Sequence, residues 1–271
     1  MGNFNLGRER AAFLVDLATS YSDIYCPGAQ AIDPIAIAKG VDLSYSAGDY
    51  GGYFDGYLEN LNGKFHAFLH LNEGEHLYMP RVRFSFAHEL GHYLIDEHRN
   101  TLLMPGVSPH GSQGIFSSDL WMEQEADYFA ASLLMPERRF RRDIFGRKFN
   151  QTLMDELRMK YNVSFTAVLL RFIALGNHPI MVVCSREGRY QWMRYSEDFP
   201  FKRLNLGVGR ELPVNTAAAE YFDDGRMYKS AEKVFAGDWF VLWNAADRRR
   251  PLQEYCVYYP RMKQVVSLLW E

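Results

Sequence analysis

The sequence has few cysteines for its length of 271 residues, and no two of them lie close together. Cys26, Cys184 and Cys256 are odd in number and lack metal-ligand spacing. Small secreted domains that depend on disulfides carry dense sets of cysteines, so that class is excluded. We expect three reduced thiols in core positions, because free cysteine is among the most buried residue types.

Long hydrophobic runs are also missing. No stretch reaches ~18 uncharged apolar residues, so the sequence predicts no membrane-spanning helix. The apolar segment after Arg8 and Arg10 is interrupted by Asp16 and lacks a cleavage-site pattern, unlike a signal peptide. These absences predict a cytoplasmic protein without a membrane partner.

Neither sign of charge dominates the chain. It has 30 Lys and Arg against 33 Asp and Glu, a formal net charge of -3. This balance gives no electrostatic reason to expect direct binding to nucleic acid. Arginines gather only at residues 138–142 and 248–250, and short basic runs of this kind are usually solvated faces.

Apolar residues make up 48% of the chain, which is enough for a substantial core. The length fits one large domain or two ordinary ones. The character of the sequence changes after Gly176, from helical periodicity to short strand-like segments. We therefore predict an α+β protein with one domain over residues 1–176 and a C-terminal β-rich or mixed α/β region over residues 177–271.

Local patterns predict the order of the elements. Helical periodicity favours helices over residues 8–25, 33–40, 80–97 and 119–135, and in further segments between 136 and 176. Asp33 is a good N-cap, and Pro34 suits the first helical position. Aromatic-rich segments between 41 and 71, two of them joined by Asn62-Gly63, predict a small antiparallel sheet. Strands are expected at 179–185, 189–196, 238–244 and 254–270.

The motif AHELGH, residues 87–92, carries the chemistry. On a helix, His88 and His92 project from one face, one turn apart, and can share a tetrahedral metal ion. Glu89 is wrongly angled to complete the same ligand set but can act as general base on a water molecule. Zinc lowers the pKa of such a water from ~15.7 toward ~7. The motif predicts one catalytic metal ion per chain, with Zn²⁺ preferred and iron or manganese as the alternatives.

A catalytic zinc site needs a third protein ligand and one open position. The helix expected over 119–135 offers Glu123 at the edge of its apolar stripe, with Asp127 one turn farther on the same side. We predict Glu123 as the ligand and Asp127 as the acid that accepts the second ring N–H of a ligand histidine. Glu125, on the opposite flank, is the alternative ligand.

Other residues near the motif have weaker signals. Asp96 is either a second partner of His92 or a solvated side chain, while His98 and His110 are expected to be ordinary loop histidines. Gly91 is expected to let another backbone approach the site. We expect a substrate to lie along the strand from Lys64 to His70 by strand addition.

The segments RFSFAHELGHYL and EQEADYFAASLLMP, with DPIAIAKGV upstream, resemble the ImmA/IrrE family of metallopeptidases over roughly residues 8–140. The resemblance implies a zincin-like core, in which a small sheet covers the HExxH helix and a second helix provides the glutamate ligand. It carries over His88, His92 and Glu123 as ligands and Glu89 as base. Many members have an N-terminal helix-turn-helix domain, whereas here the peptidase pattern begins near residue 8.

The resemblance also implies a function. It implies a zinc-dependent endopeptidase that cleaves a regulatory protein at one site, such as a DNA-binding transcriptional repressor or an antitoxin, in stress responses or on mobile elements. Such a substrate is expected to be a separate polypeptide. The alternative is a metal-binding regulatory or sensor protein with little turnover, against which the intact Glu89 argues.

Overall fold

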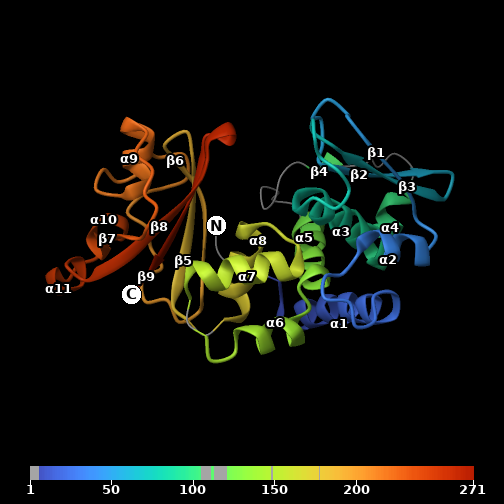
Figure 1. Cartoon of the computed structure of the whole chain (residues 1–271), viewed down its shortest axis with the longest axis horizontal. Coiled ribbons are helices and arrows are strands. Elements are labelled where there is room, and N and C mark those ends of the chain that lie inside the picture. Colours follow the sequence, from blue (N-terminus) through green and yellow to red (C-terminus); the bar gives the residue numbers. More distant parts are fainter. Residues whose placement is uncertain (1–5, 105–110, 113–120, 148, 177) are drawn as a thin grey trace. The chain divides into compact units, whose positions relative to one another are not determined.

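The computed structural model describes residues 6–104, 111–112, 121–147, 149–176 and 178–271 (Figure 1). The chain divides into two compact units, Leu6–Val168 and Leu169–Glu271, and the division runs through helix α8 (Phe165–Leu175). Both units mix helices with a sheet, which confirms the α+β class. The domain boundary expected at residues 176–177 stays a prediction.

The N-terminal unit opens with two helices that the sequence predicts well. Helix α1 (Arg8–Tyr25) buries Leu14 and Ala18, which are one turn apart on the same face. In helix α2 (Pro34–Gly40), the Asp33 carboxylate accepts the N–H of Ile35 at 3.0 Å. This bond satisfies one of the free donors at the helix start.

The sheet of this unit has the strand order β1-β3-β2-β4. Its strands are β1 (Ser44–Gly48), β2 (Gly56–Leu61), β3 (Lys64–His70) and β4 (Gly111–Ser112). Asn62 and Gly63 join β2 to β3 with φ of 54° and 83°, as expected for a tight hairpin. Strand β1 pairs with β3 in parallel, so the sheet is mixed and the all-antiparallel expectation is wrong. Since β3 is interior, the predicted substrate edge along Lys64–His70 is also wrong.

Helix α3 (Pro80–Leu94) lies under one face of this sheet. The ring of Phe86 is 5.0 Å from that of Tyr45 on β1, and the ring of Tyr93 is 5.4 Å from that of Phe65 on β3. The helix is shorter than predicted, because Ile95 adopts an extended backbone with ψ of 112°. A new helix, α4 (Asp96–Leu102), begins with two acidic residues, which favour a helix N-terminus.

Four helices complete the unit and lead to its end: α5 (Trp121–Leu134), α6 (Glu137–Ile144), α7 (Gln151–Tyr161) and α8. Helix α5 packs against both α1 and α3 through an apolar stripe that includes Ala126, Phe129 and Ala130. The start of this helix predicted at residue 119 lies outside the described residues, as does His110.

The C-terminal unit contains a sheet with the strand order β6-β5-β9-β8-β7, in which every pairing is antiparallel. The strands are β5 (Ile180–Arg186), β6 (Arg189–Tyr195), β7 (Glu232–Phe235), β8 (Pro251–Tyr259) and β9 (Gln264–Trp270). The strand predicted over 238–244 is wrong. The first two residues of that segment belong to the short helix α10 (Ala236–Trp239), and its aromatic pattern reflects the burial of Trp239 and Phe240 in the core.

A buried carboxylate joins this sheet to helix α9 (Ala217–Asp224). Glu254 on β8 is fully buried and accepts the backbone N–H groups of Ala217 at 3.0 Å and Ala218 at 3.2 Å. These donors have no partner inside the helix, so Glu254 satisfies them in place of water. Buried Cys256 lies beside Glu254, and all three cysteines are free thiols as expected.

No helix within the described ranges is long and apolar enough to cross a membrane.

The Glu254 contact predicts a local loss of stability. Replacing Glu254 with Gln turns one acceptor oxygen into an N–H donor that faces helix N–H groups. We expect the free energy of unfolding to fall by about 1–3 kcal/mol, the usual cost of an unsatisfied buried polar group. Urea unfolding of the full chain measures it. Glu211→Gln, at a side chain that is 83% exposed, is the control and should leave the midpoint unchanged.

Candidate metal centre

Close packing of α3 on α5 builds the site. A Cβ atom at Gly91 would lie 3.2 Å from the Cα atom of Ala126 and 3.1 Å from the ring of Phe129. A glycine suits this close approach of the two backbones, as the sequence predicts, because a Cβ atom here would require its neighbours to move by a few tenths of an ångström. The contact holds the HExxH face of α3 against the acidic side of α5.

Three predicted ligands converge at this contact. The Nε2 atoms of His88 and His92 are 3.0 Å apart, and they lie 3.2 and 3.1 Å from the two carboxylate oxygens of Glu123. The three donor atoms lie within 4.8 Å of one another, and all three residues are buried. The structure therefore contains a His88-His92-Glu123 cluster that is able to bind a metal ion.

Asp127 sets the state of the first imidazole. Its Oδ1 atom is 2.9 Å from Nδ1 of His88, so Nδ1 carries the proton and its N–H donates a hydrogen bond to the carboxylate. In the neutral ring, Nε2 then presents its lone pair to the cluster. Two imidazole nitrogens 3.0 Å apart, facing one carboxylate, need a cation or a shared proton between them. The donor set thus fits a divalent metal ion.

The electrostatics of the cluster agree with this reading. Burial alone would lower the pKa of His88, but hydrogen bonds to Asp127 and Glu123 raise it well above its ordinary value. Burial would raise the pKa of Glu123, and its bonds with His88 and His92 instead hold it far below the usual range. Without a metal ion, the cluster therefore retains a proton on an imidazole.

Glu89 lies beside the cluster without belonging to it. Its side chain is almost fully buried and packs on the backbone of β2: a Cβ atom at Gly56 would be 2.5 Å from Oε1 of Glu89. Asp55, which precedes Gly56, is fixed by an ion pair with Arg81 in the first turn of α3. Arg81 also bonds Glu75 and lowers the pKa of that carboxyl to about 2. No local sequence pattern predicts this contact of Gly56 with Glu89.

Glu125, the alternative ligand, points to different partners. Its two oxygens accept Nε and Nη2 of Arg10 at 2.8 and 2.6 Å, and one of them is 3.0 Å from Nε2 of His98. The structure thus brings Glu123, and not Glu125, to the two histidines. Arg10 lies on α1, far away in the sequence, and no short-range pattern could have identified this pairing.

His98 is not a loop residue, contrary to expectation. It lies on α4, is fully buried, and places its ring 5.2 Å from that of His92 and 5.4 Å from that of Trp121. Burial and the neighbouring His92 lower the pKa of His98 to about 4, so it is neutral near neutral pH. Asp96 is the solvated alternative: it is 74% exposed and pairs with Arg99 at 2.7 Å.

Two histidines of the sheet, His66 and His70, lie on the face away from the metal cluster. Side chains alternate along β3, and Phe65 contacts α3, so His66 and His70 point away from that helix. His66 bonds Ser44 and Ser46 of β1 at 2.8 and 3.0 Å.

The part of the chain that contains this site matches a known protein family. The family model of the IrrE N-terminal-like domain, Peptidase_M78, matches residues 40–172. The chain carries a domain of the Peptidase_M78 family. The resemblance to the ImmA/IrrE metallopeptidases is thereby confirmed, and the matched IrrE N-terminal-like domain includes the whole metal cluster, Glu89 and Asp127.

Among solved structures, a Mycobacterium tuberculosis transcriptional regulator is similar to the chain, with a TM-score of 0.55 and 12% sequence identity. The similarity covers 99% of this chain and 78% of that chain. At this identity it shows a shared fold. No curated protein matches the chain.

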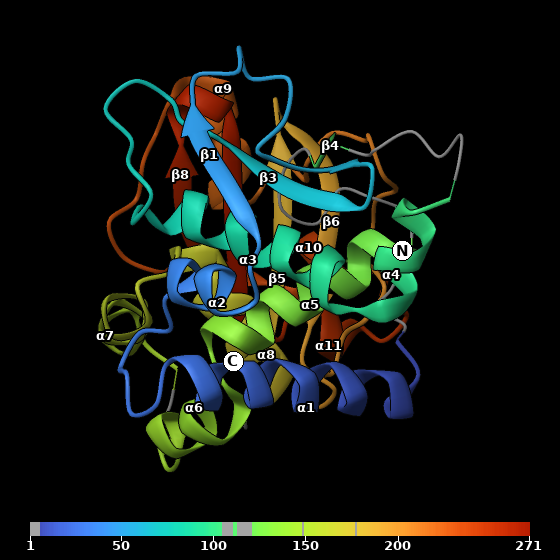
Figure 2. The same cartoon turned by 90° about the vertical axis from the view of Figure 1, so that its right-hand side faces the viewer.

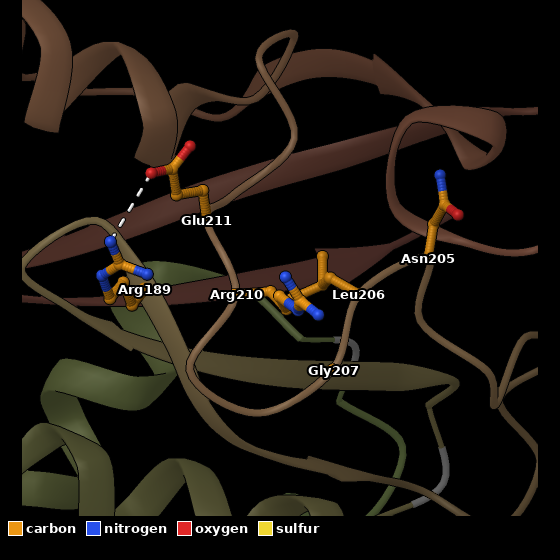
Figure 3. A pocket seen from close by; sticks show the side chains of 6 residues that line it. All are labelled: Arg189, Asn205, Leu206, Gly207, Arg210 and Glu211. Atoms are coloured by element: carbon orange, nitrogen blue, oxygen red, sulfur yellow. Dashed lines mark ion pairs between the residues drawn. The ribbon is translucent and has the colours of Figure 1, made fainter.

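The C-terminal unit has an open hollow of about 610 Å³, and its lining residues include no histidine or cysteine (Figure 3). In it, Nη2 of Arg189 faces Oε1 of Glu211 at 3.6 Å. The hollow is lined by Arg189, Asn205, Leu206, Gly207, Arg210 and Glu211. This set lacks the imidazole and thiolate donors of a zinc site.

The packing at Gly56 predicts a selective defect. In Gly56→Ala, the new methyl group overlaps Oε1 of Glu89 and displaces that carboxylate, while the metal ligands remain in place. We expect a loss of turnover of roughly 100-fold, as for a misplaced catalytic group, with metal content unchanged. Gly48→Ala on β1 is the matched control, because a Cβ atom there has no neighbour within 4 Å. Equal turnover in both variants would contradict the role of Gly56.

The raised pKa of His88 predicts how metal affinity depends on pH. A cation must displace the proton that His88 retains, so affinity rises with pH, by up to about tenfold per pH unit for each proton released. Competition with a chromogenic chelator between about pH 6 and pH 8 measures this. Asp127→Asn removes a charge that raises this pKa, so its curve should shift to lower pH. A flat profile in the wild type would refute the expectation.

Proposed function

We propose that this protein is a zinc-dependent endopeptidase that cleaves a regulatory protein, such as a DNA-binding repressor or an antitoxin, at a limited number of sites. The observation that carries the proposal is the adjacency of Glu89 to the His88-His92-Glu123 cluster inside a Peptidase_M78 domain. A metal site used only for structure or sensing has no need of a buried carboxylate next to its ligands.

Zinc is the metal that suits this donor set best. Two imidazole nitrogens and one carboxylate are the ligands of several catalytic zinc sites, which leave a fourth position open. Asp127 supports the choice, because a carboxylate on the second ring nitrogen of a ligand histidine fixes its tautomer and raises its basicity.

Each residue of the site then has a separate role in amide hydrolysis. A divalent cation, when bound, polarises the scissile carbonyl and lowers the pKa of a water molecule. The carboxylate of Glu89 takes a proton from the attacking water and later gives it to the leaving amine nitrogen. Gly56 holds Glu89 in position from the strand side, and Asp127 keeps the proton of His88 on Nδ1, so that Nε2 stays available.

Two variants separate the ligand from the base. Elemental mass spectrometry should find about one zinc per chain in the wild type and in Glu89→Gln, and little in His88→Ala, because only the latter loses a ligand. Zinc retained in His88→Ala, or absent from the wild type after zinc is supplied, would refute the assigned ligands.

Proteolysis is tested on a protein mixture by labelling new N-termini. The zinc-loaded wild type should generate a small set of new N-termini in DNA-binding regulatory proteins, and Glu89→Gln should generate none of them. The same N-termini in both samples would contradict the peptidase proposal. With zinc bound and no cleavage, the alternative of a metal-binding regulatory protein with little turnover would stand.

A further inference from the structure

The sheet of the N-terminal unit has a second face, on the side away from α3. Because Tyr45 and Phe65 contact α3, the alternate residues of β1 and β3 point to the opposite side. Both views draw α2, α3 and α4 on the other side of this sheet (Figures 1 and 2). We define the aromatic face as the outward side chains of this sheet and of the loop before β2: Tyr50, Phe54, Tyr57, His66 and Phe68.

Four of these rings form a closed set of contacts. Tyr50 lies 5.3 Å from Phe54 and 5.8 Å from Phe68, and Tyr57 lies 5.4 Å from Phe54 and 6.1 Å from Phe68. All four are partly exposed to solvent. A contiguous patch of partly exposed aromatic rings is typical of a binding surface, whereas single exposed rings are ordinary.

The loop next to the face adds to it. Gly51 and Gly52 both have positive φ, 67° and 71°, and they bring Tyr53 to a position where its side chain is 78% exposed. Asp49 opens this loop with a side chain that is 82% exposed; its Oδ1 accepts the N–H of Gly51 at 2.8 Å and lies 3.8 Å from Nδ1 of His70.

Acidic side chains border the rings. Glu59 lies two residues from Tyr57 on the same side of β2, about 7 Å along the strand, and stands opposite His66 in the register. Within the described residues, Glu59 has no ion pair, and Lys64 at the end of β3 does not pair with it. Burial, together with the charge of Glu59, raises the pKa of Tyr57.

This combination decides what can cover the face. An apolar partner would bury the Glu59 carboxylate without a counter-ion, which costs several kcal/mol. A phosphate backbone would be repelled by Glu59 and Asp49. A guanidinium group satisfies both features, because it stacks on an aromatic ring and pairs with a carboxylate at the same time.

We propose that the aromatic face, bordered by Glu59 and Asp49, is a docking surface for an arginine-containing segment of a partner protein. It lies on the side of the sheet opposite the helix that carries Glu89, so it would bind a segment of the partner without contacting the reacting atoms. The proposal does not depend on peptidase activity.

The docking surface is tested by selecting binders from a display library of random twelve-residue peptides. The full-length Glu89→Gln chain is immobilised for this selection, so that no peptide is cleaved. Peptides selected on this chain should be enriched in arginine. The affinity for a selected peptide is then measured by fluorescence anisotropy. It should fall by at least about fivefold when Asp49→Asn and Glu59→Gln are both introduced into the Glu89→Gln chain.

Glu9→Gln/Asp16→Asn is the matched control, because it removes the same charge from two exposed positions of α1. It should leave affinity unchanged, which separates docking from a general attraction to an acidic protein. Thermal unfolding of both double variants verifies that they fold. The proposal is overturned if selected peptides show no arginine enrichment, or if both double variants weaken binding equally.

Discussion

The whole site depends on one contact, in which the backbone of α3 at Gly91 approaches the backbone of α5 at Ala126. Metal ligands that come from two helices must be held to within a few tenths of an ångström. A Cβ atom at Gly91 would press on Ala126 and Phe129 of α5 at 3.1–3.4 Å, so these neighbours would have to move by a few tenths of an ångström. The glycine lowers the helical propensity of α3, and the packing of a nearly fully buried helix compensates for that loss.

Around this contact, each element fixes one part of the chemistry. Gly56 at the start of β2 packs on the carboxylate of Glu89. The ion pair of Arg81 with Asp55 connects the residue before this strand to the first turn of α3. Helix α1 reaches α5 through Arg10 and Glu125, next to the ring pair of His98 and His92. The site is thus built on rigid elements and not on loops, as precise positioning of ligands requires.

Much of this could be predicted from local sequence. Helical spacing of His88 and His92, the i+4 relation of Glu123 and Asp127, and the turn at Asn62-Gly63 are short-range patterns with one physical solution each. Long-range choices were not accessible. The parallel pairing of β1 with β3 depends on chain connectivity, and the partnership of Arg10 with Glu125 joins residues 115 positions apart.

Two wrong predictions, the helix over residues 80–97 and the strand over residues 238–244, have a common cause. Residues 80–97 have continuous helical periodicity, yet the chain bends at Ile95 and buries His98 beside His92. Residues 238–244 have the aromatic composition of a strand, yet Trp239 and Phe240 fill the core from a short helix and a single bridge. In both places tertiary burial outweighs local propensity.

The three acids of α5 illustrate a further consequence. Glu123, Glu125 and Asp127 occupy alternate positions of one buried helix segment, and each faces a different partner: a metal ion that would bind with His88 and His92, the guanidinium of Arg10, and the imidazole of His88. Only the first of these partners can leave the protein. Ligand binding to the native state alone adds RT ln(1 + [L]/Kd) to stability. A metal ion held by His88, His92 and Glu123 would therefore stabilise the native state, and the folded fraction would rise with the free concentration of that ion.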